Sequence, residues 1–314
     1  MDMQGVRLAW DAIPAKVRTS VSCALGSPVV CAESQPGGFS PGLAARCSLA
    51  DGRRYFLKAV STDQNPDSPG LYRQEGRVVR AMPQGLPVPA LIEVIDKGNW
   101  VVLIFEDVEG RPPPLPWSLE ALGATFKVLD DLAAATTPCP ITSLPGIAER
   151  LGSSLDGYRR LAGGEGAVDR VDPWSRRHLD RLAELETGWE AAARGDTLLH
   201  TDLRADNLLV RPDGSVVLVD WPHACIGAAW VDKVCLLPSV GLDDGPAPSL
   251  VEQRLRPFAG VDRDAVDRVL VAVAGYFTFR GGLPDPPGLP TLRRFQRAQG
   301  EVSRRWVAQR LDLG

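Results

Sequence analysis

The stretch that decides the fold runs from His200 to Asp220 and reads HTDLRADNLLVRPDGSVVLVD. It contains two short apolar runs on either side of a Pro-Asp-Gly-Ser turn signal, and this pattern predicts a β-hairpin. If Asp213 and Gly214 form a two-residue loop, the strand pairing brings Asn207 opposite Asp220. Directly opposed residues of an antiparallel pair point to one face of the sheet, with Cβ atoms roughly 4.5–5.5 Å apart.

The polar residues at the open end of this hairpin have the chemistry of a phosphoryl-transfer site. The amide oxygen of Asn207 and the carboxylate of Asp220 are the hard oxygen ligands that Mg²⁺ prefers. Asp202 lies at the mouth of the same hairpin, where it can accept a proton from an attacking hydroxyl or orient it. An ordinary hairpin with polar ends is the alternative. The spacing Asp-x4-Asn-x12-Asp, with a histidine two residues before the first aspartate, argues against it.

A second cluster lies far upstream. Residues 36–42, PGGFSPG, form a glycine-rich loop whose backbone N–H groups can approach phosphates without a Cβ in the way. The next segment predicts two strands around an Asp-Gly turn, and a two-residue loop there pairs Lys58 with Ala45. A lysine within an apolar strand needs a partner, and Glu75 in an amphipathic segment is the candidate. A plain glycine turn and a surface lysine remain the alternatives.

Taken together, these motifs resemble the aminoglycoside phosphotransferase family, the small-molecule branch of the protein-kinase-like fold. The resemblance extends from about Val29 to the C-terminal helices, and its most specific part is His200-x-Asp202-x4-Asn207 with Asp220-Trp221. It implies an α+β, two-lobed fold. The N-terminal lobe would hold an antiparallel β-sheet with a helix, and the C-terminal lobe would be mainly α-helical with a catalytic β-hairpin.

The resemblance also implies a role for each matching position. Asp202 would be the catalytic base, Arg204 would contact the transferred phosphoryl group, and Asp232 would brace the catalytic loop. Asn207 and Asp220 would hold Mg²⁺, with ATP or GTP as the phosphoryl donor. Lys58, positioned by Glu75, would hold the α- and β-phosphates, and the strand and hinge near residues 100–110 would pair with the base. The implied nucleotide-binding residues are Gly37, Gly38, Phe39, Ser40, Lys58, Glu75, Glu106 and Val108.

The sequence departs from the protein-kinase pattern in ways that bear on the acceptor. It contains no G-x-G-x-x-G, and Asp220-Trp221-Pro222 stands where protein kinases have Asp-Phe-Gly. Pro222 has no backbone N–H to donate. Few residues separate Asp220 from Asp232, and no Ala-Pro-Glu follows, so there is little room for a regulatory phosphosite or a docked peptide. A small-molecule acceptor is therefore favoured over a protein acceptor.

Composition sets the wider limits. With 314 residues, 44% hydrophobic and 24% charged, the chain has the composition of a globular protein with substantial cores. We expect residues 1–105 to form a nucleotide-binding lobe and residues 106–314 a catalytic and substrate-binding lobe. In the first lobe we expect helices near 14–25 and 68–83, with strands near 28–34, 43–50, 53–60, 88–95 and 99–106.

Composition and sequence patterns also indicate the binding partners and the cellular compartment of the protein. A net charge of −4 without a basic stripe argues against a nucleic-acid partner. No apolar run reaches the ~20 residues of a membrane span, and the N-terminus lacks an export signal. The six cysteines show no CxxC, which is typical of reduced thiols in a cytoplasmic protein. We expect a cytoplasmic monomer or homodimer that binds no nucleic acid and no membrane.

The function predicted from these patterns is transfer of a γ-phosphoryl group to a hydroxyl of a small molecule, with an antibiotic as the leading acceptor. A housekeeping kinase for choline, a sugar or an amino alcohol is the alternative, and a pseudokinase-like binding module is a third hypothesis. Two groups of residues are candidates for the acceptor site. The acidic residues Asp243, Asp244 and Glu252 suit a polycation. The aromatic residues Trp230, Tyr276, Phe279 and Trp306 suit a flatter ligand, and packing or solvation is the plainer interpretation of both groups.

Overall fold

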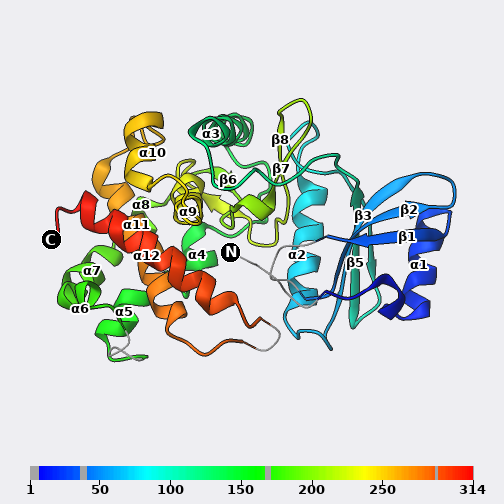
Figure 1. Cartoon of the computed structure of the whole chain (residues 1–314), viewed down its shortest axis with the longest axis horizontal. Coiled ribbons are helices and arrows are strands. Elements are labelled where there is room, and N and C mark those ends of the chain that lie inside the picture. The colour runs from blue at the N-terminus through cyan, green and yellow to red at the C-terminus, as the bar shows by residue number, and fades with distance from the viewer. Residues whose placement is uncertain (1–6, 36–40, 167–170, 287–288, 314) are drawn as a thin grey trace.

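The computed structural model describes residues 7–35, 41–166, 171–286 and 289–313. Its first part is a five-stranded antiparallel sheet in the order β1-β2-β3-β5-β4, with helices α1 (Ala15–Leu25) and α2 (Ser68–Ala81). Figure 1 shows the sheet at one end of the molecule and most of the helices at the other, with α2 between them. The strands are β1 (Val29–Ser34), β2 (Leu43–Leu49), β3 (Arg54–Ser61), β4 (Leu91–Asp96) and β5 (Trp100–Glu106).

The sheet is covered on both faces, and β5 shows why, because it is apolar from Trp100 to Phe105. Val102 and Ile104 of β5 belong to the cluster that packs under α1. Val101, Leu103 and Phe105 alternate with them and belong to the core that includes α2 and continues into the helical part. Successive side chains of a strand point to opposite faces, so this alternation follows from the strand geometry. The same rule turns Lys58 of β3 toward α2.

The second part is mainly helical, and its core surrounds α11 (Arg263–Gly281), which packs along α12 (Leu292–Arg310) (Figure 1). Two short antiparallel pairs of strands interrupt the helices: β6 (Thr197–Leu199) pairs with β9 (Cys225–Gly227), and β7 (Leu208–Val210) pairs with β8 (Val216–Leu218). The remaining helices are α3 (Leu119–Ala135), α4 (Ile147–Leu151), α5 (Gly157–Ala162), α6 (Pro173–Arg177), α7 (Leu179–Glu186), α8 (Trp189–Ala192), α9 (Val231–Val240) and α10 (Pro248–Leu255), with 3₁₀ turns at Trp10–Ala12 and Ala205–Asn207.

This architecture confirms the predicted fold class, with an antiparallel sheet and a helix followed by a helical part that carries a short hairpin. The predicted elements of the sheet part are present with small shifts at their ends. β4, for example, begins at Leu91. All six cysteines are free thiols. Within the described part of the chain, no helix is both long and apolar enough to cross a membrane.

The predicted register of the catalytic hairpin is wrong by one residue. Val210 pairs with Val216 and Leu208 with Leu218, so Asn207 and Asp220 are not directly opposed. The loop has three residues: the backbone N–H of Arg211 donates to the carbonyl of Ser215, and Gly214 adopts a positive φ of 83°. A turn of this kind needs only its glycine in the left-handed region, whereas the predicted two-residue turn would need Asp213 there as well.

The hairpin between β2 and β3 repeats this geometry and the same error. Lys58 pairs with Ala44 and not with Ala45. Gly52 has a φ of 86°, and its N–H donates to the carbonyl of Leu49. In both turns the aspartate side chain accepts a hydrogen bond from the backbone N–H two residues later, Asp51 from Arg53 and Asp213 from Ser215. This local bond stabilises the longer turn.

The helical core leaves no room at Gly157, the first residue of α5. A Cβ built there would overlap the carbonyl group of Gly275 in α11. We expect Gly157→Ala to destabilise the fold by about 1–3 kcal/mol, because overpacking pushes α5 away from α11. Thermal and urea unfolding would measure the change. The control is Gly70→Ala in α2, where a Cβ meets nothing within 4 Å, so this variant should unfold like the wild type or at a slightly higher temperature. Equal stability of the two variants would contradict the packing argument.

Candidate active site

Lys58 is the point where the sheet, α2 and the catalytic hairpin meet. Its Nζ donates to Glu75 Oε2 at 2.5 Å and to Asp220 Oδ1 at 2.8 Å. Lys58 and Glu75 are almost fully buried, with 8% and 1% of their surfaces exposed. Gly76 lets α2 approach this closely, since a Cβ there would press on Val94 and Leu103. The predicted partnership of Lys58 and Glu75 is therefore present, and Asp220 joins it from the other part of the chain.

The charges of this trio depend on one another. Burial alone would lower the pKa of Lys58, but the nearby carboxylates of Asp220 and Glu75 outweigh it and raise that pKa. Burial would raise the pKa of Asp220, but Lys58 outweighs it and holds the pKa of Asp220 below its ordinary value. For Glu75 burial prevails and raises the pKa. Lys58 is thus a fixed cation, and Asp220 is a fixed anion.

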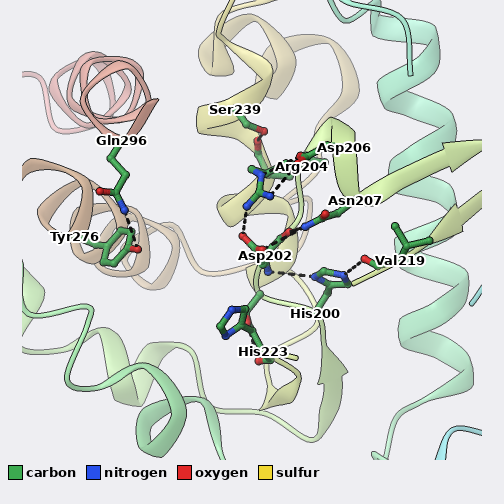
Figure 2. A network of polar contacts seen from close by, with 12 residues as sticks. His200, Asp202, Arg204, Asp206, Asn207, Val219, His223, Ser239, Tyr276 and Gln296 are labelled. Atoms are coloured by element: carbon green, nitrogen blue, oxygen red, sulfur yellow. Dashed lines mark hydrogen bonds and ion pairs between the residues drawn. The ribbon is translucent and has the colours of Figure 1, made fainter. Parts of the chain in front are cut away.

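The loop that carries Asp202 is held from behind by two buried groups. Asp232 of α9 accepts hydrogen bonds from the backbone N–H groups of His200 and Thr201, both at 2.8 Å. This matches the bracing role expected for Asp232. His200 is fully buried and accepts the N–H of Asp202 at Nδ1, so its Nε2 carries the proton and donates to the carbonyl of Val219 (Figure 2). The histidine therefore links the start of the loop to the strand end before Asp220.

Asp202 and Arg204 form a connected network at the front of this loop. Arg204 donates to Asp202 Oδ1 at 2.6 Å and to both carboxylate oxygens of Asp206 at 3.0 Å. Burial would lower the pKa of Arg204, but Asp202 and Asp206 outweigh it and raise it. Asp202 is a third exposed, whereas Arg204 is largely enclosed. The guanidinium expected to contact a phosphoryl group is therefore held by two carboxylates, as Figure 2 shows.

Asn207 and Asp220 have free oxygen atoms suited to a divalent cation. The Nδ2 of Asn207 donates to the carbonyl of Asp202 at 2.7 Å and to its Oδ2 at 3.3 Å, which leaves Oδ1 of the amide available. Asp220 uses Oδ1 for Lys58, which leaves its Oδ2. Among the described residues, no cluster of three or more His, Cys, Asp or Glu side chains could hold a metal. Two protein oxygens nevertheless suit Mg²⁺, which takes the rest of its shell from phosphates and water.

A cavity of about 330 Å³ lies between the sheet and the hairpin. Lys58, Glu75, Asn207 and Asp220 line it, and so do the predicted hinge residues Glu106 and Val108. Apolar side chains from both parts enclose it, including Phe56, Val79, Phe105 and Leu209. The remaining predicted nucleotide-binding residues, Gly37, Gly38, Phe39 and Ser40, lie outside the described residues.

Arg46 of β2 is a residue of this cavity that the sequence analysis missed. It donates to the carbonyl groups of Val108 and Gly110 at 3.0 and 2.9 Å. Its Nε also lies 3.3 Å from Asp107 Oδ1. One arginine thus fixes the segment that connects the sheet with the helical part. An arginine at that position in a strand carries no sequence signal for this role, because its partners are more than sixty residues away.

Asp202 and Arg204 line a different cavity, of about 370 Å³, on the helical side of the catalytic loop. Within the described ranges no residue lines both cavities, and the hydrogen bond from Asn207 to Asp202 crosses the boundary between them. Of the aromatic candidates only Tyr276 lines the second cavity. Phe279 lines another cavity, Trp306 is fully buried in the core, and Trp230 packs against it.

The acidic candidates for a polycation site lie elsewhere. Asp243 and Asp244 are exposed in the turn after α9. Glu252 accepts hydrogen bonds from Trp306 and Arg310 at the far side of α12. None of the three lines the cavity beside Asp202, so the acidic site considered from the sequence is not formed by these residues.

This chain is similar to known proteins in sequence and in fold. The model of a family described as "Phosphotransferase enzyme family" matches residues 43–267, which include the sheet from β2 onward and the catalytic hairpin. A comparison with curated protein sequences found no match.

Three solved structures share the fold. A thermostable mutant of aminoglycoside phosphotransferase APH(4)-Ia, in a ternary complex with AMP-PNP and hygromycin B, gives a TM-score of 0.59 at 14% identity, covering 93% of this chain and 98% of that chain. Amicoumacin kinase hAmiN, in complex with AMP-PNP, Ca²⁺ and Ami, gives 0.54 at 14%, covering 94% and 95%. Choline kinase LicA from Streptococcus pneumoniae gives 0.56 at 13%, covering 92% and 98%. These likenesses confirm the predicted kinase-like fold.

The trio around Lys58 predicts how Asp220 titrates. Lys58 is the largest of the charges that oppose the effect of burial on Asp220, so in Lys58→Met we expect the pKa of Asp220 to rise. In the wild type, Asp220 stays ionised as the pH falls through the ordinary aspartate pKa of about 4, and its contribution to stability is lost only as the pH falls through its lowered pKa. Carboxyl NMR with ¹³C-labelled aspartate measures both proteins. Lys127→Met, which breaks an exposed pair with Asp131, is the control. An unchanged titration of Asp220 in Lys58→Met would contradict the prediction.

Proposed function

This chain belongs to the phosphotransferase enzyme family, and we propose that it moves the γ-phosphoryl group of ATP or GTP to a hydroxyl of a small molecule. The observation that carries the proposal is the trio of Lys58, Glu75 and Asp220, because it sets one fixed cation and one fixed anion in an apolar cavity. A nucleotide triphosphate needs both, since its phosphates pair with the lysine and its metal ion with the carboxylate.

The donor assignment rests on the lining of the first cavity and on relatives. Phe56, Val79, Phe105 and Leu209 offer apolar surface for a flat base, and Glu106 and Val108 line the same cavity at and just after the end of β5. AMP-PNP is present in the structures of the aminoglycoside phosphotransferase and of amicoumacin kinase. These facts favour ATP as the donor, and GTP is the alternative.

The proposed chemistry divides between the two cavities. Lys58 would hold the phosphates of the donor, and a divalent cation between Asn207 and Asp220 would neutralise their charge. Asp202 would accept the proton of the acceptor hydroxyl, or orient that hydroxyl, for in-line attack. Arg204 fixes one carboxylate oxygen of Asp202, and Asn207 contacts the other. Asp202 is thereby aimed at the boundary between donor and acceptor.

The acceptor hypotheses from the sequence remain proposals. An antibiotic is the leading acceptor, with a housekeeping metabolite such as choline, a sugar or an amino alcohol as the alternative. Relatives of the same fold include an aminoglycoside phosphotransferase, an amicoumacin kinase and a choline kinase. A pseudokinase-like module is disfavoured because Lys58, Asp202, Asn207 and Asp220 are all present, with Lys58 in contact with Asp220 and Asn207 in contact with Asp202. The free cysteines favour a reducing compartment, so we propose a cytoplasmic enzyme.

A screen for phosphoryl transfer tests this function. Purified protein is incubated with Mg²⁺ and ATP or GTP over a panel of hydroxylated antibiotics and metabolites, and mass spectrometry detects an added phosphoryl group. We expect Asp202→Asn to lose at least about 10²-fold in turnover while binding nucleotide normally, because the proton acceptor is removed. Asp244→Asn, a change of the same kind on an exposed turn, should keep full activity. An Asp202→Asn variant that retains more than about a tenth of wild-type turnover would refute the role of Asp202.

The metal role of Asp220 has its own test. We expect Asp220→Asn to weaken nucleotide binding only when Mg²⁺ is present, because the variant loses a negatively charged oxygen ligand. Calorimetric titration of AMP-PNP with and without Mg²⁺ measures the difference. If the variant gains as much affinity from Mg²⁺ as the wild type does, Asp220 is not a metal ligand.

A further inference from the structure

The cavity beside Asp202 has an unusual balance of charge. Among the described residues that line it, Asp202 is the only carboxylate, and Arg204 already neutralises one of its oxygens at 2.6 Å. Two arginines line the cavity, Arg150 and Arg204. Arg204 also pairs with Asp206, so the charge that repels a cationic ligand is that of Arg150. Among the described lining residues, only the already paired Asp202 could bind an ammonium group.

Two further arginines lie near Tyr276. The guanidinium of Arg280 lies 5.9 Å from the centre of the Tyr276 ring. Arg293 is buried and donates to the amide oxygen of Gln296 at 2.7 Å. Burial lowers the pKa of Arg293, and the charge of Arg280 adds to that effect, so the two arginines act on the same region. Asp285 offsets part of this positive charge, because it acts on the pKa of Arg293 in the opposite direction.

The polar groups inside the cavity are mostly donors. Gln296 donates to the hydroxyl oxygen of Tyr276 at 3.3 Å, so the hydroxyl proton of Tyr276 is left for another acceptor (Figure 2). Gln299 is 4% exposed and lines the cavity. Its side-chain amide has two N–H donors. A ligand with carbonyl, hydroxyl or carboxylate oxygens would accept hydrogen bonds from them.

The rest of the wall is apolar. Leu151, Leu155, Phe277 and Phe295 come from separate elements of the chain and face the same space. The volume of about 370 Å³ lies in the range of pockets for small organic ligands. An extended, fully hydrated polyamine gains no binding free energy from such an apolar wall. A molecule with an aromatic or aliphatic face gains it by burying that face against the wall.

From this cavity we infer that the acceptor is an uncharged or anionic hydroxy compound with an apolar face, and that a polycationic aminoglycoside is excluded. The inference rests on the proposed function, because it takes the cavity beside Asp202 as the acceptor site. The acceptor hydroxyl would lie at Asp202, its oxygen acceptors near Tyr276 and Gln299, and its apolar face against the leucine and phenylalanine side chains.

Binding of matched ligands tests the inference separately from catalysis. Three 4-nitrophenyl glycosides of similar size serve as probes: the uncharged glucoside, the anionic glucuronide and the cationic glucosaminide, with hygromycin B as a polycation. Calorimetry on the full chain with Mg²⁺ and ADP measures each affinity. We expect the glucoside and glucuronide to bind at least about tenfold more tightly than the two amines. Tighter binding of either amine, or no binding by the uncharged and anionic probes, would overturn the inference.

A substitution on α12 supplies the matched control. Gln299→Glu places a carboxylate in the cavity, and we expect about a tenfold loss of glucuronide affinity and a gain for the glucosaminide. Gln309→Glu makes the same change on an exposed position of the same helix and should alter neither affinity. Tyr276→Phe removes the hydroxyl and should weaken glucuronide binding about tenfold without changing the fold. Wild-type affinities in both cavity variants would overturn the assignment of this cavity.

The outcomes distinguish the two proposals. If uncharged or anionic compounds bind but no panel member is phosphorylated, the proposed function fails and the charge selectivity of the cavity stands. If phosphoryl transfer is found only for polycationic aminoglycosides, the proposed function stands and this inference fails.

Discussion

A buried lysine must have its charge compensated, and in this molecule the compensation comes from two carboxylates that reach it from different parts of the chain. Glu75 arrives from α2 and Asp220 from the end of the catalytic hairpin. The contact therefore fixes the helix against the sheet and the hairpin against both. Without it, the sheet and the helical part would still each have a core, but the cavity between them would lose its charged floor. The ion pair is thus a requirement of the site more than a source of stability, in keeping with the high cost of desolvating charges.

The sequence predicted the elements of the sheet and the motif of the catalytic loop, because both depend on local patterns. Alternation of apolar residues located β3 and β5, and the spacing from Asp202 to Asp220 located the chemistry. The prediction of strand register failed in both hairpins for one reason. An Asp-Gly pair fits both a two-residue and a three-residue turn. Which turn forms depends on whether the aspartate adopts a positive φ, and the amino-acid sequence does not show this.

The residues that the sequence analysis missed share a different cause. Arg46, Arg150 and Gln299 act through partners that are distant in the chain, or through the shape of a cavity built by several helices. Their own neighbours in the sequence give no signal for such roles. The donor side of the site was predictable because a phosphate and a metal demand particular side chains. The acceptor side was not, because its lining comes from α2, the catalytic loop, α11 and α12 together.

The separation of the two cavities by the hydrogen bond from Asn207 to Asp202 has a kinetic consequence. Since none of the side chains that the structure describes lines both spaces, neither ligand has to be present for these walls around the other to form. Such an arrangement favours a random order of addition, in which the enzyme can be saturated with donor or with acceptor first. The two products would also dissociate independently, so the phosphorylated compound could leave before or after the nucleoside diphosphate.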